Sequence, residues 1–112
     1  MLEFWALRPN ESAEMVDGAI EYDPNRKPEF SIEIAAFHRI LDNGLTRFAS
    51  EIGLSYFDDV LIDEKSSQKI LNILMEIDKR LNPSGARTEN RVMAEFFSNA
   101  VSQNLKVVVV CD

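Results

Sequence analysis

The carboxylates between residues 57 and 64 are the feature of this sequence best suited to chemistry. The stretch reads FDDVLIDE and holds four acidic side chains: Asp58, Asp59, Asp63 and Glu64. Mg²⁺ and Ca²⁺ bind such oxygen ligands, commonly from alternate positions of a loop that also has a central glycine. Here the apolar residues 60–62 stand where further ligands would be needed. A metal site is therefore the weaker interpretation of these carboxylates.

The two acidic pairs call for different explanations. Asp63 and Glu64 precede a run with helical spacing, and negative charge stabilises the N-terminus of a helix. Asp58 and Asp59 have no role at a helix start, so they either form a turn or belong to a contact surface, and Tyr56 and Phe57 precede them. An aromatic side chain beside carboxylates is typical of a protein-binding surface. We therefore predict a partner-binding surface that includes Glu51, Tyr56, Asp58 and Asp59.

The chain has one histidine and one cysteine, and neither has the neighbours that catalysis requires. His38 falls at the edge of an apolar helical stripe, where a surface position is the simpler interpretation. Cys111 follows four valines, which favours a strand residue over a reactive thiol. The sequence also lacks the glycine-rich phosphate loops and the HExxH, GxSxG and CxxC motifs. We predict no catalytic residue, no metal ligand and no cofactor.

The composition indicates one small acidic domain that spans residues 1–112. Twelve Lys and Arg stand against 19 Asp and Glu, which gives a net charge of −7. The basic residues are scattered, and this argues against nucleic-acid binding, which needs a basic face. A basic protein partner is compatible with this charge, although acidity also serves solubility. Without a signal peptide, a membrane span or a disulfide framework in the sequence, we expect a cytoplasmic protein.

Three segments have the apolar spacing of helices. In the first, apolar residues recur every three or four positions, at Ile34, Phe37, Leu41, Leu45, Phe48 and Ile52. This predicts a helix over 31–53 with Ser31 as its N-cap and Gly53 as its C-cap. Asn43-Gly44 marks either a weak spot in this helix or the border between two short helices in line. Further helices are expected at 63–82 and 88–104, the last ending at Asn104.

Strands are expected near both ends of the sequence, at 2–8 and 105–111. Residues 107–110 are four consecutive valines, so both faces of that strand are apolar. Such a strand is central in a sheet or covered on both sides, and the first strand is its obvious partner. The sequence leaves open whether 18–23 forms another strand and in what order the strands pair. The expected fold class is α+β, with three helices packed on a small sheet built from the N- and C-terminal strands.

The run EIGLSYFDDVLIDEKSSQKILNIL, together with ALRPNE, IEYDP and the small acidic format, resembles bacterial immunity proteins of polymorphic toxin and contact-dependent inhibition systems. The resemblance covers about half of the chain, and it carries no motif from which functional residues transfer. It implies a non-enzymatic protein that binds a cognate toxin domain, often a basic nuclease, and occludes its active site or an essential surface. One alternative is a small adaptor or regulatory protein-binding domain. Another is a metal-assisted hydrolase built on Asp58, Asp59 and Glu51.

Overall fold

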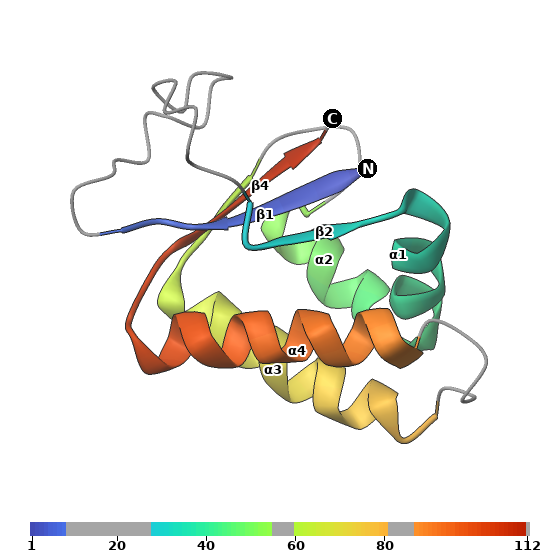
Figure 1. Cartoon of the computed structure of the whole chain (residues 1–112). Coiled ribbons are helices and arrows are strands. Elements are labelled where there is room, and N and C mark those ends of the chain that lie inside the picture. Colours follow the sequence, from blue (N-terminus) through green and yellow to red (C-terminus); the bar gives the residue numbers. More distant parts are fainter. Residues whose placement is uncertain (9–27, 55–59, 81–86, 112) are drawn as a thin grey trace.

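A computed structural model of the chain describes residues 1–8, 28–54, 60–80 and 87–111, in which helices pack on one face of a four-stranded sheet (Figure 1). The strands are β1 (Leu2–Ala6), β2 (Phe30–Ile32), β3 (Val60–Ile62) and β4 (Val107–Cys111). The helical segments are α1 (Ile34–Ile40), η2 (Leu41–Leu45), α2 (Thr46–Ile52), α3 (Glu64–Asp78) and α4 (Arg87–Ser102). The α+β class is therefore confirmed, and the sheet contains the two expected terminal strands.

The sheet is antiparallel throughout, with the strand order β2-β1-β4-β3. The valine strand β4 lies between β1 and β3, and Val107, Val108 and Val109 are fully buried. The prediction of a central strand is thus confirmed. Alternation along the strands places Leu2, Phe4 and Ala6 of β1 on the face toward the helices.

An aromatic cluster joins this face of the sheet to helix α4. The ring centroid of Phe4 lies 5.3 Å from that of Phe30 and 5.9 Å from those of Phe96 and Phe97. Three of the contacts within the cluster are edge-to-face, which the quadrupoles of aromatic rings favour. Burial of these rings holds β1, β2 and α4 in fixed relation.

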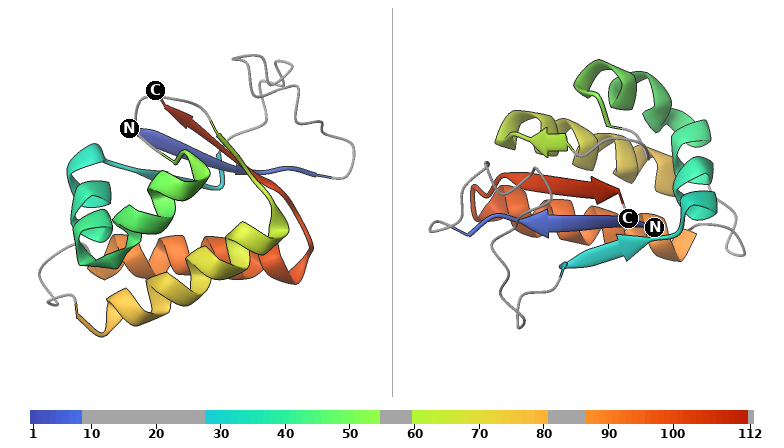
Figure 2. Two further views of the ribbon diagram at one scale, coloured as in Figure 1. Left: turned by 180° about the vertical axis from the view of Figure 1, so that it is seen from behind. Right: turned by 90° about the horizontal axis from the view of Figure 1, so that it is seen from above.

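The first helical region departs from the prediction at both its start and its centre. Residues 30–32 form β2, so Ser31 is a strand residue paired with Glu3, and Glu33 occupies the N-cap position of α1. A chain kink follows at Gly44, whose φ of 141° and ψ of −1° are not helical. Figure 2 shows α1 and α2 at an angle to each other, so they are not two helices in line.

The kink is held by polar contacts that replace regular helix bonds. The Asn43 side-chain amide donates to the Arg39 carbonyl at 2.7 Å, and the Thr46 hydroxyl donates to the Leu41 carbonyl at 2.8 Å. From α3's end, the Arg80 guanidinium donates to the Asn43 carbonyl at 3.1 Å. These hydrogen bonds stabilise the kink, which is therefore a specific feature of the fold.

The predicted helix ends at Gly53 and Asn104 are confirmed. Gly53 has φ 75°, and the Leu54 N–H donates to the Ala49 carbonyl at 2.8 Å. Asn104 has φ 55°, and the Leu105 N–H donates to the Ala100 carbonyl at 2.9 Å. Both ends use a residue in the left-handed conformation to satisfy the last carbonyls of the helix. The expected strand at 18–23 lies outside the described residues.

Candidate functional site

Of the four predicted partner-binding residues, the structure describes Glu51. Its side chain lies exposed in the last turn of α2, and its carboxylate is 3.9 Å from Nε of Arg47. The Arg47 side chain is 95% exposed, so this pair contributes little to stability and leaves Glu51 accessible. Tyr56, Asp58 and Asp59 lie outside the described residues. A surface common to all four therefore stays a prediction.

Asp63 has the helix-starting role that the sequence predicts. It is the N-cap of α3, and its Oδ1 accepts a hydrogen bond from the Ser66 N–H at 2.7 Å. This backbone hydrogen bond is the main cause that lowers the pKa of Asp63 below its ordinary value of 3.8. Glu64 adds negative charge in the first turn of the same helix.

The negative charge of the chain is distributed unevenly between its segments. The residues that the structure describes carry ten Lys and Arg and eleven Asp and Glu, so this framework is nearly neutral. Six of the seven net negative charges belong to residues 9–27, to Asp58 and Asp59, and to Asp112. Most of the net negative charge thus lies in the sequence segments 9–27, 58–59 and 112.

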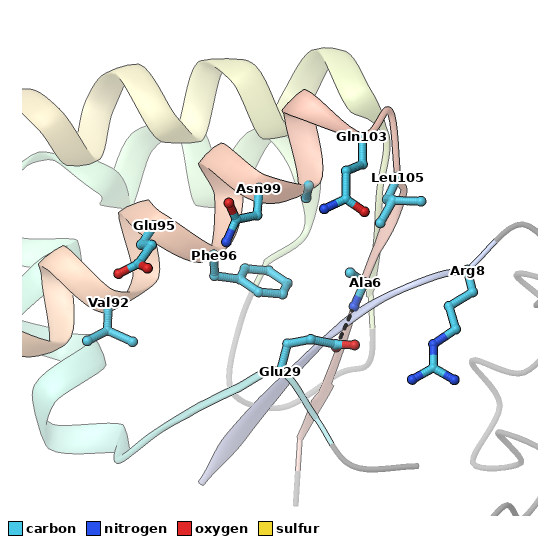
Figure 3. A pocket seen from close by; sticks show the side chains of 10 residues that line it. Ala6, Arg8, Glu29, Val92, Glu95, Phe96, Asn99, Gln103 and Leu105 are labelled. Carbon is cyan, nitrogen blue, oxygen red and sulfur yellow. Dashed lines mark hydrogen bonds between the residues drawn. The ribbon is translucent and has the colours of Figure 1, made fainter.

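The described residues form a groove of about 500 Å³ between α4 and the end of β1 (Figure 3). One wall is α4, which presents two parallel stripes at a spacing of four residues. The apolar stripe is Val92, Phe96 and Ala100, and the polar stripe is Glu95, Asn99 and Gln103. Ala6, Arg8 and Glu29 line the opposite side, and Leu105 lies beside Gln103 at one end. We refer to this depression as the α4 groove.

The α4 groove exists because β2 is shorter than β1. The ladder between them covers Leu2 to Phe4 of β1, and Pro28, which has no N–H, precedes β2 by two residues. Beyond the ladder, the Ala6 N–H donates to the Glu29 carboxylate at 2.8 Å. The Glu29 carboxylate thus accepts a hydrogen bond from an N–H of β1 that lies beyond the end of β2. Helix α4 continues past this point, and the space beneath it stays open.

The polar stripe of the α4 groove is available for binding. Within the part of the chain that the structure describes, the side chains of Glu95, Asn99 and Gln103 make no hydrogen bond or ion pair. Figure 3 shows Glu95 beside Val92 at one end of the groove, and Gln103 near Leu105 at the other. The Arg8 side chain extends away from α4 in the same view. The stripe therefore offers one carboxylate and two amides.

Two smaller depressions lie beside residues that make internal contacts. The one beside Gly44 and Arg80 is about 280 Å³ and adjoins the kink. The other, of about 210 Å³, lies between α3 and α4, where Asp78 meets Arg91 at 3.1 Å and Arg87 at 3.6 Å. The buried Asn90 donates to the Leu74 carbonyl there at 3.0 Å. These groups connect the helices to each other.

The described residues contain no group of three or more His, Cys, Asp or Glu side chains that could hold a metal ion. His38 is exposed on α1. Within the same residues, no helix has the length and apolar character that crossing a membrane requires. The metal site weighed for Asp58, Asp59 and Glu51 stays a hypothesis, since the first two lie outside the described residues.

Comparisons with models of protein families, with curated proteins and with solved structures give no match for this chain. The α4 groove was not predicted from the sequence, although the spacing of 95, 99 and 103 is visible there. A polar stripe on a helix ordinarily indicates a solvated face, and the contact between Glu29 and Ala6 that leaves the groove open spans 23 positions.

Proposed function

We propose that the chain is a cytoplasmic immunity protein that binds and neutralises a cognate bacterial toxin domain and has no catalytic activity of its own. The partner is a basic protein, such as a nuclease domain. The observation that carries this proposal is the distribution of charge, with a nearly neutral framework and six net negative charges on the segments 9–27, 58–59 and 112. The resemblance of the sequence to immunity proteins supports it.

The charge distribution suits an inhibitor that must capture its target quickly. Complementary charge raises the rate of diffusional encounter, up to about 10⁸–10⁹ M⁻¹s⁻¹ at low salt. The near-neutral charge of the described residues limits repulsion among them, while the acidic segments supply the attraction. Bound in this way, the protein acts by occluding the active site or an essential surface of the toxin. Glu51, Tyr56, Asp58 and Asp59 are the residues that we propose for this contact.

The test is charge reversal at the acidic pair Asp58 and Asp59, with Asp58→Lys and Asp59→Lys combined. The partner to be used is a toxin domain encoded by a reading frame adjacent to that of this chain, and the measurements are growth protection and the association rate at several salt concentrations. We expect the double variant to associate about tenfold more slowly and to lose most of its salt dependence. Absence of toxin binding by the unmodified chain would contradict the proposal.

A matched control distinguishes the effect of the charges at 58 and 59 from the effect of the net charge of the protein. Glu33→Lys with Glu76→Lys changes the net charge by the same amount at exposed positions. Glu33 follows the edge strand β2, on the opposite side of the sheet from β3, and Glu76 lies near the far end of α3. We expect this control to associate at nearly the rate of the unmodified chain. Equal slowing of both variants would assign the effect to net charge and remove Asp58 and Asp59 from the contact.

A small adaptor domain is the second candidate, and the α4 groove is compatible with it as well. A groove with apolar and amide lining suits a segment of many different proteins. An adaptor would bind its partner without protecting cells from the adjacent toxin domain. The growth measurement therefore distinguishes the two candidates.

A further inference from the structure

The spacing of the polar stripe on α4 matches the repeat of an extended peptide. Residues four apart on a helix are separated by about 6 Å along its axis. Alternate residues of an extended strand, which point to the same side, are separated by about 6.6 Å. Glu95, Asn99 and Gln103 therefore stand in register with successive same-side groups of a peptide that runs along α4.

The chemistry of the stripe specifies what such a peptide presents. Side-chain amides have both donors and acceptors, so Asn99 and Gln103 suit the N–H and C=O of peptide groups. Glu95 suits a cation, because a carboxylate without a partner is satisfied best by Lys or Arg. Arg8, the basic residue that lines the groove, lies at the end opposite Glu95, and its side chain extends away from α4 (Figure 3). The Glu29 carboxylate already accepts a hydrogen bond from Ala6.

The apolar stripe supplies the remaining contact area. Val92 is 44% exposed and Phe96 forms the floor beside it, with 7% of its surface accessible. A volume of about 500 Å³ falls within the range of about 300–1,000 Å³ that is usual for binding pockets. An apolar side chain of the peptide would cover the exposed part of Val92. The stem of a basic residue, which is itself apolar, would pack along the same surface.

We propose that the α4 groove binds an extended segment of a partner protein, with a lysine or arginine on Glu95, peptide groups on Asn99 and Gln103, and an apolar side chain against Val92 and Phe96. The proposal deepens the proposed function and rests on it for the identity of the partner, a basic toxin domain. It adds a second contact with the partner to the one proposed at Asp58 and Asp59.

The test uses a peptide alone, so it does not depend on the toxin. Acetyl-Gly-Arg-Val-Leu-Gly-amide is titrated into the ¹⁵N-labelled chain, and the side-chain amide signals of Asn99 and Gln103 are followed by NMR. We expect saturable shifts with a Kd of about 1–10 mM, as is usual for few contacts. The same peptide with citrulline in place of arginine keeps the shape without the charge, and we expect it to bind about fivefold more weakly.

Variants assign the effect to the groove. Glu95→Gln should weaken the arginine peptide about fivefold and leave the citrulline peptide unchanged. Glu76→Gln removes an exposed carboxylate on α3 and should change neither. Absence of saturable shifts at Asn99 and Gln103 up to about 20 mM peptide, a concentration that would detect any Kd in the expected range, would overturn the proposal. So would equal binding of the two peptides.

Three further outcomes have separate meanings. Shifts of the same signals on dilution without peptide would show that a second copy of the chain occupies the groove, and this too would overturn the proposal. If the peptide binds but the adjacent toxin domain does not, the groove stands and the proposed function fails. If the toxin domain binds while the peptide does not, the proposed function stands and the groove assignment fails.

Discussion

Asp63 lies between the end of β3 and the start of α3, and its carboxylate caps α3 through one hydrogen bond. Its Oδ1 accepts from the Ser66 N–H at 2.7 Å, and this bond favours the ionised carboxylate. The pKa of Asp63 in the folded chain is therefore below its ordinary value of 3.8. A group whose pKa is lowered by folding contributes stability above its unfolded pKa, and that contribution is lost as the pH falls through the folded pKa.

Replacing this residue should change stability in a pH-dependent way. At pH 7 we expect Asp63→Ala to lower the melting temperature, because the Ser66 N–H loses its acceptor. The difference from the unmodified chain should narrow as the pH falls below the ordinary value of 3.8. Asp63→Asn is the control, since asparagine also caps helices but does not titrate. Thermal unfolding across this pH range measures the effect, and a constant difference would contradict it.

The kink in η2 requires a backbone conformation at Gly44 that few residue types adopt. Gly44 has φ 141°, a conformation that side chains other than glycine rarely adopt. A Cβ at this position would lie 3.4 Å from Nη1 of Arg80, whose guanidinium holds the Asn43 carbonyl. Gly53 is left-handed as well, with φ 75°, but its surroundings are open within 4 Å.

These two glycines form a matched pair for mutation. Gly44→Ala should lower the free energy of unfolding by about 1–3 kcal/mol, because of the backbone strain at φ 141°. Gly53→Ala should cost about 1 kcal/mol, and Gly53→Asn less, because asparagine tolerates the left-handed region. Urea unfolding measures all three variants. A smaller loss for Gly44→Ala than for Gly53→Ala would show that the kink relaxes on substitution.

Local signals allowed the sequence to predict some elements and not others. Gly53 and Asn104 mark helix ends because their left-handed conformations depend on residue type. Strand β2 was missed, since three residues that lead into a helical stripe show no alternation, and it is pairing with β1 that makes them a strand. The same holds for the α4 groove, which depends on the long-range contact between Glu29 and Ala6. For Tyr56, Asp58 and Asp59, the partner-binding prediction rests on sequence alone.

For the molecule as a whole, Phe4 lies at the junction between the sheet and the helices. It is fully buried, and its ring contacts Phe30 of β2 and both Phe96 and Phe97 of α4. Phe4→Ala should reduce the free energy of unfolding by about 3–5 kcal/mol, from lost burial and the cavity left behind. Small domains are stable by about 5–15 kcal/mol in total, so this change approaches unfolding.

Two controls show whether the loss comes from packing at this junction. Phe4→Leu keeps most of the apolar volume and should cost well under half as much. Val92→Ala removes a partly exposed side chain of α4, and its effect should be within about 0.5 kcal/mol. Chemical denaturation measures the series. Similar losses for Phe4→Ala and Val92→Ala would contradict the central role of the aromatic cluster.

The position of β4 has a consequence for synthesis on the ribosome. This strand is the last element in chain order, yet it is the one that pairs with both β1 and β3. A nascent chain that has not yet exposed residues 107–111 has no bridge between these two strands, and each offers an open edge for pairing with other chains. Folding of the sheet is therefore completed only after translation of Val107–Cys111. Until then the unpaired apolar strands are exposed to association with other chains.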